Sequence, residues 1–197
     1  MSPIDRLTQM FEKFPGIGPR QARRFVQYLL VAGAGTRGEL SDLIKKLGTE
    51  TSQCKQCFRW FVKNENTSGL CSICGDSHRD ASILFVVEKD ADIDQVERSN
   101  FKGRYFVLGG TIPLASEEPG KYIRLADLAH RVAENNLKEI ILGLSATTEG
   151  DHTRQILQEK LRDSNIKISS LGRGLSTGSE LEYADPDTIA SALNSRS

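Results

Sequence analysis

The spacing of the cysteines constrains this sequence most, because all four lie between residues 51 and 80. They form two C-x2-C pairs separated by thirteen residues, Cys54 with Cys57 and Cys71 with Cys74. A two-residue gap lets both thiolates of a pair face one point, and two such pairs complete a tetrahedral cage for Zn²⁺. Four sulfur ligands leave no open position for water, so we expect one structural zinc ion per chain.

Other uses of these cysteines stay open. A redox C-x-x-C pair would need only two of them, and iron–sulfur clusters have different typical spacings. Residues 51–80 contain few aliphatic side chains, so a bound metal is expected to hold this segment together. Trp60 and Phe61 lie between the pairs and could stack on bases, but we favour packing over the metal core. Four nearby cations could offset the charge of the thiolates: Lys55, Arg59, Lys63 and Arg79.

The composition favours small modules in series rather than one large globule. Apolar residues make up 38% of the chain and charged residues 26%. No apolar run is long enough to span a membrane, and the N-terminus lacks the layout of a signal peptide, so we expect a soluble cytoplasmic protein. Residues 1–80 hold twelve Lys and Arg against eight Asp and Glu, whereas residues 81–197 hold fourteen against eighteen. The first part suits a polyanion and the second a basic protein partner or a metal, and ordinary solvated surfaces are the alternative explanation of the split.

Residues 1–50 are expected to form helices around a glycine-containing turn. Apolar residues recur at helical spacing before Pro15 and again after Pro19, and a third helix carries Leu40, Leu43 and Ile44. The exposed N–H groups at a helix start carry partial positive charge and can bind phosphate. These residues resemble a helix–hairpin–helix element, although a plain hairpin with a solvated basic face is the alternative. We predict sequence-independent DNA binding by Lys13, Gly16, Gly18, Arg20, Arg23 and Arg24.

Residues 81–171 alternate apolar runs with helical patterns, which predicts a small α/β domain with a mostly parallel sheet. The expected strands are 83–87, 105–108, 139–144 and 166–168, with helices near 91–98, 123–136 and 150–164. A tail, 172–197, ends in a short helix after Asp185. The predicted fold class is therefore α/β multi-module: hairpin helices, four-cysteine module, α/β domain and helical tail.

Glu88 follows the first expected strand at its carboxyl end, where open α/β sheets place their sites. The segment resembles the Toprim domain, whose enzymes combine this glutamate with an Asp-x-Asp pair to hold Mg²⁺. Here Ser145 and Thr147 replace those aspartates. We therefore expect a scaffold without cleavage or polymerising chemistry. A metal-dependent phosphoryl-transfer enzyme, nuclease or primase-like, is the runner-up, with a weak site rebuilt by Glu149 and Asp151.

Acidic residues surround this expected edge of the sheet. They could receive a basic protein partner, or they could simply be solvated residues at helix starts, where the helix dipole stabilises them. The candidate partner-binding residues are Glu88, Asp90, Asp92 and Glu149, with Asp94 nearby.

The order of these segments resembles the RecR family of bacterial recombination mediators over about residues 3–196. The resemblance rests on Phe14–Pro19, the four cysteines, Val86–Glu88, Val107–Gly110 and Leu181–Asp185. It implies ring-shaped tetramers that encircle DNA and that act with RecO, and in many bacteria RecF, to load RecA onto single-stranded DNA. It also implies that Arg20 and Arg24 are the hairpin cations. A zinc-ribbon interaction module with no nucleic-acid role is the remaining alternative.

Overall fold

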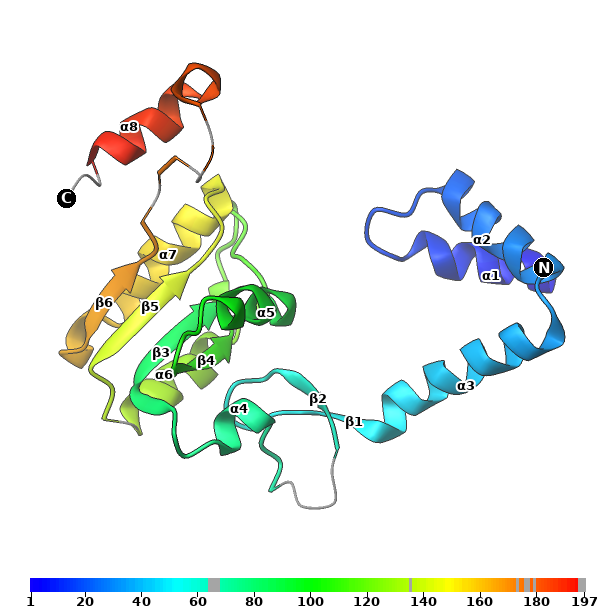
Figure 1. Cartoon of the computed structure of the whole chain (residues 1–197), viewed down its shortest axis with the longest axis horizontal. Coiled ribbons are helices and arrows are strands. Elements are labelled where there is room, and N and C mark those ends of the chain that lie inside the picture. Colours follow the sequence, from blue (N-terminus) through cyan, green and yellow to red (C-terminus); the bar gives the residue numbers. More distant parts are fainter. Residues whose placement is uncertain (64–67, 135, 173, 176–177, 179, 195–197) are drawn as a thin grey trace. The chain divides into compact units, whose positions relative to one another are not determined.

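The computed structural model describes residues 1–63, 68–134, 136–172, 174–175, 178 and 180–194 (Figure 1). The chain divides into two compact units, Met1–Thr51 and Ser52–Ser197. The first unit is helical, and the second contains the four-cysteine module, a parallel sheet with its helices, and the tail. The predicted α/β multi-module fold class is confirmed.

The first unit begins with two helices that pack on one another. Helix α1 (Pro3–Glu12) is capped by Ser2, whose hydroxyl accepts a hydrogen bond from the Asp5 N–H while the Asp5 carboxylate accepts one from the Ser2 N–H. Helix α2 (Pro19–Val31) begins with proline at its first position. The Phe11 ring meets the Phe25 ring edge-on at 5.6 Å, which joins the two helices. The predicted helical hairpin is confirmed.

Helix α3 (Ala34–Glu50) completes the first unit and buries none of its side chains. Its apolar residues are exposed instead: Leu40, Leu43, Ile44 and Leu47. The helix was expected, but no described residue of the first unit covers its apolar face.

The four-cysteine module contains two short paired strands and one helical turn. These are β1 (Thr51–Gln53), β2 (Trp60–Val62) and α4 (Ser72–Gly75). Periodicity could not predict these strands, because three residues are too few to show an alternation.

The sheet of the second unit has four parallel strands in the order β4-β3-β5-β6. They are β3 (Asp80–Val87), β4 (Gly103–Val107), β5 (Glu139–Gly143) and β6 (Lys167–Ser170), at or within three residues of the predicted positions. In the centre of the sheet, Phe85 lies opposite Tyr105 on β4 and Ile141 on β5. All carboxyl ends therefore meet at one edge, which we call the carboxyl edge.

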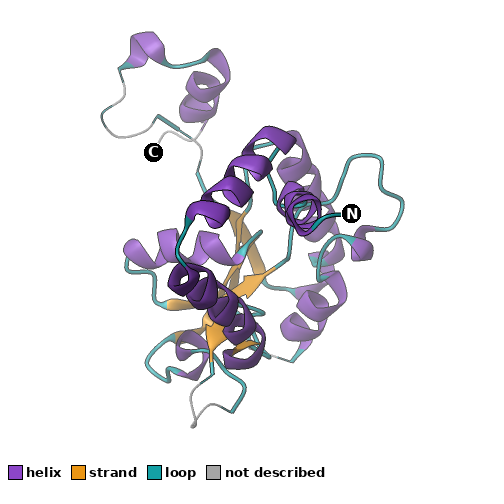
Figure 2. Ribbon diagram, turned by 90° about the vertical axis from the view of Figure 1, so that its right-hand side faces the viewer, coloured by secondary structure: helices purple, strands orange, loops and turns teal. Residues whose placement is uncertain are grey.

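Helices cover both faces of this sheet (Figure 2). Helix α5 (Asp90–Arg98) and the cysteines pack on the face that carries Phe85 and Val87. Helices α6 (Leu125–Ala133) and α7 (Thr148–Lys160) pack on the opposite face, against Leu84 and Val86. The predicted helix 123–136 is shorter than expected, and its residue 135 lies outside the described residues. The four-cysteine module and the sheet thus share one hydrophobic cluster.

Short elements complete the second unit. A 3₁₀ turn, η1 (Pro119–Lys121), precedes α6, and η2 (Arg162–Ser164) follows α7. The tail contains η3 (Leu181–Tyr183) and α8 (Pro186–Asn194), where Asp185 accepts a hydrogen bond from the Thr188 N–H at 2.8 Å, as expected of a cap. Among the described helices, none combines the length and apolarity that a bilayer crossing requires.

Candidate metal centre and nucleic-acid interface

The four cysteine side chains meet at one buried point of the second unit. Their sulfur atoms all lie within 4.8 Å of one another, and the Sγ atoms of Cys57 and Cys71 are 3.6 Å apart. A tetrahedral site with Zn–S bonds of about 2.3 Å requires sulfur separations of about 3.8 Å. The cluster therefore fits a tetracoordinate metal such as Zn²⁺, and the predicted ligands do come together.

Backbone geometry positions these sulfurs. The Cys71 N–H donates to the Cys54 sulfur at 3.4 Å, the kind of contact that orients a thiolate ligand. Phe58, which follows the first pair, has a left-handed backbone (φ 62°), and its N–H donates to the Cys54 carbonyl. The Val107 N–H donates to the Cys57 carbonyl at 2.9 Å. This hydrogen bond connects the first cysteine pair to β4, the strand at one edge of the sheet.

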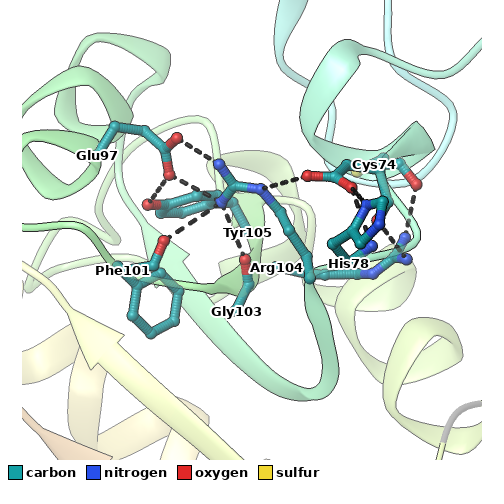
Figure 3. Close-up of polar contacts among 9 residues, drawn as sticks. Cys74, His78, Glu97, Phe101, Gly103, Arg104 and Tyr105 are labelled. Atoms are coloured by element: carbon teal, nitrogen blue, oxygen red, sulfur yellow. Dashed lines mark hydrogen bonds and ion pairs between the residues drawn. The ribbon is translucent and has the colours of Figure 1, made fainter.

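Two arginines connect the region of the second cysteine pair to neighbouring elements, and Figure 3 labels one of them, Arg104. Arg104 on β4 donates to the Cys74 carbonyl at 2.6 Å and to the Asp76 carbonyl at 3.4 Å. Arg79 makes a two-pronged ion pair with Glu97 on α5, at 2.9 and 2.5 Å. Arg104 was not among the predicted countercations, since it is remote in sequence and only strand pairing brings it to the cysteines.

Ionisation within this network follows its contacts. Hydrogen bonding to the Arg79 guanidinium lowers the pKa of Glu97, so this carboxylate stays charged. Burial, followed by the hydrogen bond to Glu97, raises the pKa of Tyr105. Cysteine thiols are ordinarily protonated at neutral pH, so a metal displaces protons when it binds the four sulfurs.

The two aromatic residues between the cysteine pairs have different environments. Phe61 packs against the cysteine cluster, as expected. Trp60 is 59% exposed, so the interpretation that it packs over the metal core is wrong. Successive strand residues point to opposite sides, so only one of these two neighbours can face the core.

Glu88 lies buried at the carboxyl edge and is already bonded to the neighbouring loop. Its Oε1 atom accepts a hydrogen bond from the Ser145 N–H at 2.6 Å. The Ser145 and Thr147 hydroxyls are 2.9 Å apart, and Thr147 also caps α7 through the Gly150 N–H. A Cβ at Gly150 would lie 2.2 Å from the Ser145 carbonyl, so glycine is required for this close approach. Neutral hydroxyls thus stand beside the single carboxylate.

The other acidic residues around this edge differ in their contacts. Asp90 accepts a hydrogen bond from the Trp60 N–H at 2.7 Å, and Asp92 accepts one from the Lys89 N–H at 2.8 Å. Glu149 is exposed and receives a long hydrogen bond from the Thr111 hydroxyl. Asp151 pairs with Arg154. These acids therefore do not form a cluster aimed at one cation.

The hairpin residues of the first unit lie on its surface. Gly16 has φ 75°, a conformation that favours glycine, and Gly18 precedes α2 without supplying a side-chain cap. Lys13, Arg20 and Arg24 are exposed, and the last two share one face of α2, since they are four residues apart. Arg23 is also exposed but lines a groove between α1 and α2 with Asp5 and Glu12.

A parallel sheet with a glutamate at its carboxyl edge is the arrangement of a Toprim domain, here without the aspartates of the Toprim enzymes. The family model described as Toprim domain matches residues 82–172, and the model described as RecR, C-terminal, matches residues 174–197.

Curated relatives match almost the whole chain. Recombination protein RecR of Rickettsia bellii is 37% identical over 98% of this chain and 94% of its own length. The protein of the same name from Rickettsia felis is 38% identical over the same shares, and that from Cereibacter sphaeroides is 36% identical over 98% and 95%. The chain belongs to the RecR family of recombination proteins.

Proposed function

We propose that this chain is a non-catalytic mediator of recombinational DNA repair, which binds DNA through its hairpin and a basic protein through its carboxyl edge. In this scheme the partner is RecO, with RecF where it is present, and the assembly helps to load RecA onto single-stranded DNA. The protein acts in the cytoplasm. The observation that carries the non-catalytic assignment is the bond between Glu88 and the Ser145 N–H.

Two features of the carboxyl edge disfavour catalysis, namely the hydrogen bond of Glu88 and the uncharged side chains beside it. Phosphoryl transfer by a Toprim enzyme needs several carboxylates to hold Mg²⁺, since the ion prefers charged oxygen ligands in an octahedral arrangement. Glu88 is buried and shares its oxygen with a backbone donor, and Ser145 and Thr147 offer hydroxyls that carry no charge. The carboxyl edge is therefore better suited to supporting a loop than to holding a catalytic ion.

The hairpin supplies the DNA contacts in this proposal. Exposed amides at the start of α2 favour a phosphate, and Arg20 and Arg24 add two charges on the same helix face. Gly16 and Gly18 allow close approach of the backbone, and Lys13 lies just before the turn. Such contacts fix a protein on DNA without reading its sequence. Arg23 is assigned a smaller part because Asp5 and Glu12 lie in its groove.

Self-assembly accounts for the exposed apolar side chains at both ends of the chain. The uncovered face of α3 and exposed Leu181, Tyr183 and Leu193 in the tail are large apolar groups that monomers seldom leave in water. They support the ring-shaped homotetramer that the family resemblance implies. Light scattering of the purified protein, with and without DNA, measures the stoichiometry.

Zinc is the metal that we assign to the four cysteines, one ion per chain in a structural role. The sulfur separations suit its tetrahedral geometry, and four buried thiolates leave no open coordination position. The ion would be held by Cys54, Cys57, Cys71 and Cys74, and it supplies folding energy rather than chemistry.

The hairpin assignment is tested by DNA affinity measured over a range of salt concentrations. Changing Arg20→Glu together with Arg24→Glu is expected to weaken binding by more than tenfold and to reduce the slope of log affinity against log salt by about two. The matched control, Lys45→Glu with Lys46→Glu, reverses two exposed charges on α3 of the same unit. Equal affinity of the hairpin variant and the wild type would refute the assignment.

The catalytic alternative has its own test. Nuclease and primer-synthesis assays with Mg²⁺ or Mn²⁺ are expected to give no activity above background for the wild type. Activity that Glu88→Gln abolished would instead establish the phosphoryl-transfer function.

A further inference from the structure

Strand β2 presents two large apolar side chains to solvent on one side. Trp60 and Val62 are 59% and 63% exposed, while Phe61 between them packs against the cysteine cluster. Alternation along the strand places Trp60 and Val62 on the same face. Tryptophan is strongly enriched at binding hot spots, so an exposed tryptophan on an ordered strand is a candidate contact residue for a partner.

Trp60 is held in place by the start of helix α5. The backbone N–H of Trp60 donates to the Asp90 Oδ2 atom at 2.7 Å. The neighbouring Arg59 reaches the same helix, with its Nε atom 3.3 Å from Asp90 Oδ1 and its Nη2 atom 2.6 Å from Asp94 Oδ1. The backbone that carries the indole is therefore fixed before any partner arrives, which lowers the entropy lost on binding.

The charges at the start of α5, which the Trp60 backbone contacts, select the kind of partner. One guanidinium, that of Arg59, faces two carboxylates, so the contact has an excess of negative charge. The Asp94 side chain is still 62% exposed, and it remains accessible to a second cation. A nucleic acid that laid a base on the indole would bring its phosphates toward these carboxylates. A segment with several cations would gain from both groups, because one cation can pair with the carboxylate while another stacks on the ring.

We propose that Trp60, Val62 and Asp94 contact an arginine-rich segment of a partner protein, one of whose guanidinium groups stacks on the indole while another pairs with Asp94. This inference rests on the proposed function, in which a basic protein binds near the carboxyl edge, and it extends that surface onto the four-cysteine module. The module then has a recognition role in addition to its metal.

Trp60 is the only tryptophan in the chain, so its fluorescence reports directly on this surface. The metal-loaded full-length protein is titrated with a short oligoarginine peptide that lacks aromatic residues, and in parallel with oligolysine and with oligo-dT. Oligoarginine is expected to change the emission in a saturable manner and at lower concentration than oligolysine, because a guanidinium stacks on an indole better than an ammonium does. The variant Arg20→Glu with Arg24→Glu is expected to give the same peptide titration.

Variants are measured with a dye-labelled oligoarginine peptide by anisotropy, after circular dichroism and metal content have shown that they are folded. Trp60→Ala is expected to weaken binding about fivefold to tenfold, and Trp60→Phe less. Tyr122→Ala removes another exposed aromatic residue and is expected to change nothing. Asp94→Asn is expected to weaken binding severalfold at low salt only, whereas Asp163→Asn, the same change on exposed η2, has no effect.

The alternative results are distinct. Emission that responds to oligo-dT and not to oligoarginine would make Trp60 a base-stacking residue and overturn the proposal. If Glu149→Lys abolished peptide binding while Trp60→Ala and Asp94→Asn did not, the carboxyl edge would bind basic partners without Trp60; the inference would fail and the proposed function would stand. If no variant of either region changed binding, both would fail.

Discussion

The four-cysteine module and the hairpin are both built on short loops, but their key side chains have opposite surroundings. The cysteines are buried, and hydrogen bonds from Val107 and Arg104 connect their backbone to the sheet. Arg20 and Arg24 are exposed on α2. Burial of the side chains indicates a structural part, whereas exposed cations beside helix amides indicate a binding part. Mutations should therefore damage stability in the module and DNA affinity in the hairpin.

The largest effect is expected from Cys71→Ser. Loss of one thiolate weakens the metal site, and structural zinc contributes on the order of 10 kcal/mol to the folding of small metal modules. We expect the metal content to fall well below one ion per chain and thermal unfolding to begin at a clearly lower temperature. Ser72→Ala, an exposed neighbour, is the control and should leave both unchanged. Wild-type stability in Cys71→Ser would remove the structural role of the site.

A smaller loss of stability is expected from Glu97→Gln, because this change breaks the ion pair with Arg79. At neutral pH it should cost about 2 kcal/mol of unfolding free energy, as charged hydrogen bonds of limited exposure do. Because the folded protein lowers the pKa of Glu97, this stabilisation is present above the unfolded-state pKa and is lost as pH falls through the folded-state value.

Denaturant titrations of wild type and Glu97→Gln across pH 3 to 7, about the range over which carboxylates titrate, measure this difference. The two proteins should converge at the acidic end. Glu159→Gln on the exposed face of α7 is the control. If the difference in unfolding free energy between the two proteins did not depend on pH, the carboxylate charge would not be what stabilises the contact.

Glu88→Gln tests whether the carboxyl edge behaves like the module. We expect a loss of about 1 kcal/mol in unfolding free energy, because the amide oxygen can still accept the hydrogen bond from the Ser145 N–H but without charge. DNA affinity should stay at the wild-type value. Glu117→Gln in an exposed loop is the control, and a tenfold change in DNA affinity would contradict the structural assignment of Glu88.

The smallest expected effect on DNA affinity is that of changing Arg23. Comparing it with Arg20 shows which hairpin cations contact phosphate. Arg23→Gln is expected to weaken DNA binding less than twofold, since nearby Asp5 and Glu12 already offset its charge. Arg20→Gln should weaken binding severalfold and reduce the salt slope by about one. Affinities measured side by side at several salt concentrations give the comparison. Equal losses would place Arg23 among the phosphate contacts.

Local spacing predicted that the four cysteines come together and where along the chain the strands lie. The C-x2-C pairs and continuous apolar runs such as Ile83–Val87 are dictated by nearby residues, and both appear where they were expected. Glu88 was placed correctly at the end of its strand because strand ends are visible in the sequence.

Long-range contacts could not be predicted in the same way. Arg104 reaches Cys74 only because β4 lies at the outer edge of the sheet, and Asp90 meets Trp60 across thirty residues. The exposure of Trp60 follows from which face of β2 points inward, and a strand of three residues gives no periodicity from which to infer it. The bare face of α3 was not foreseen, because an apolar helix pattern does not state what covers it.

We infer that a bound metal, and not the small apolar content of the module, holds the four-cysteine region together. Native mass spectrometry of protein purified without added zinc tests it most directly, with circular dichroism followed as a chelator is added. We predict one zinc ion per chain and a loss of folded structure that tracks the loss of metal. A folded protein with a zinc-to-chain ratio near zero would show that the module folds without the metal.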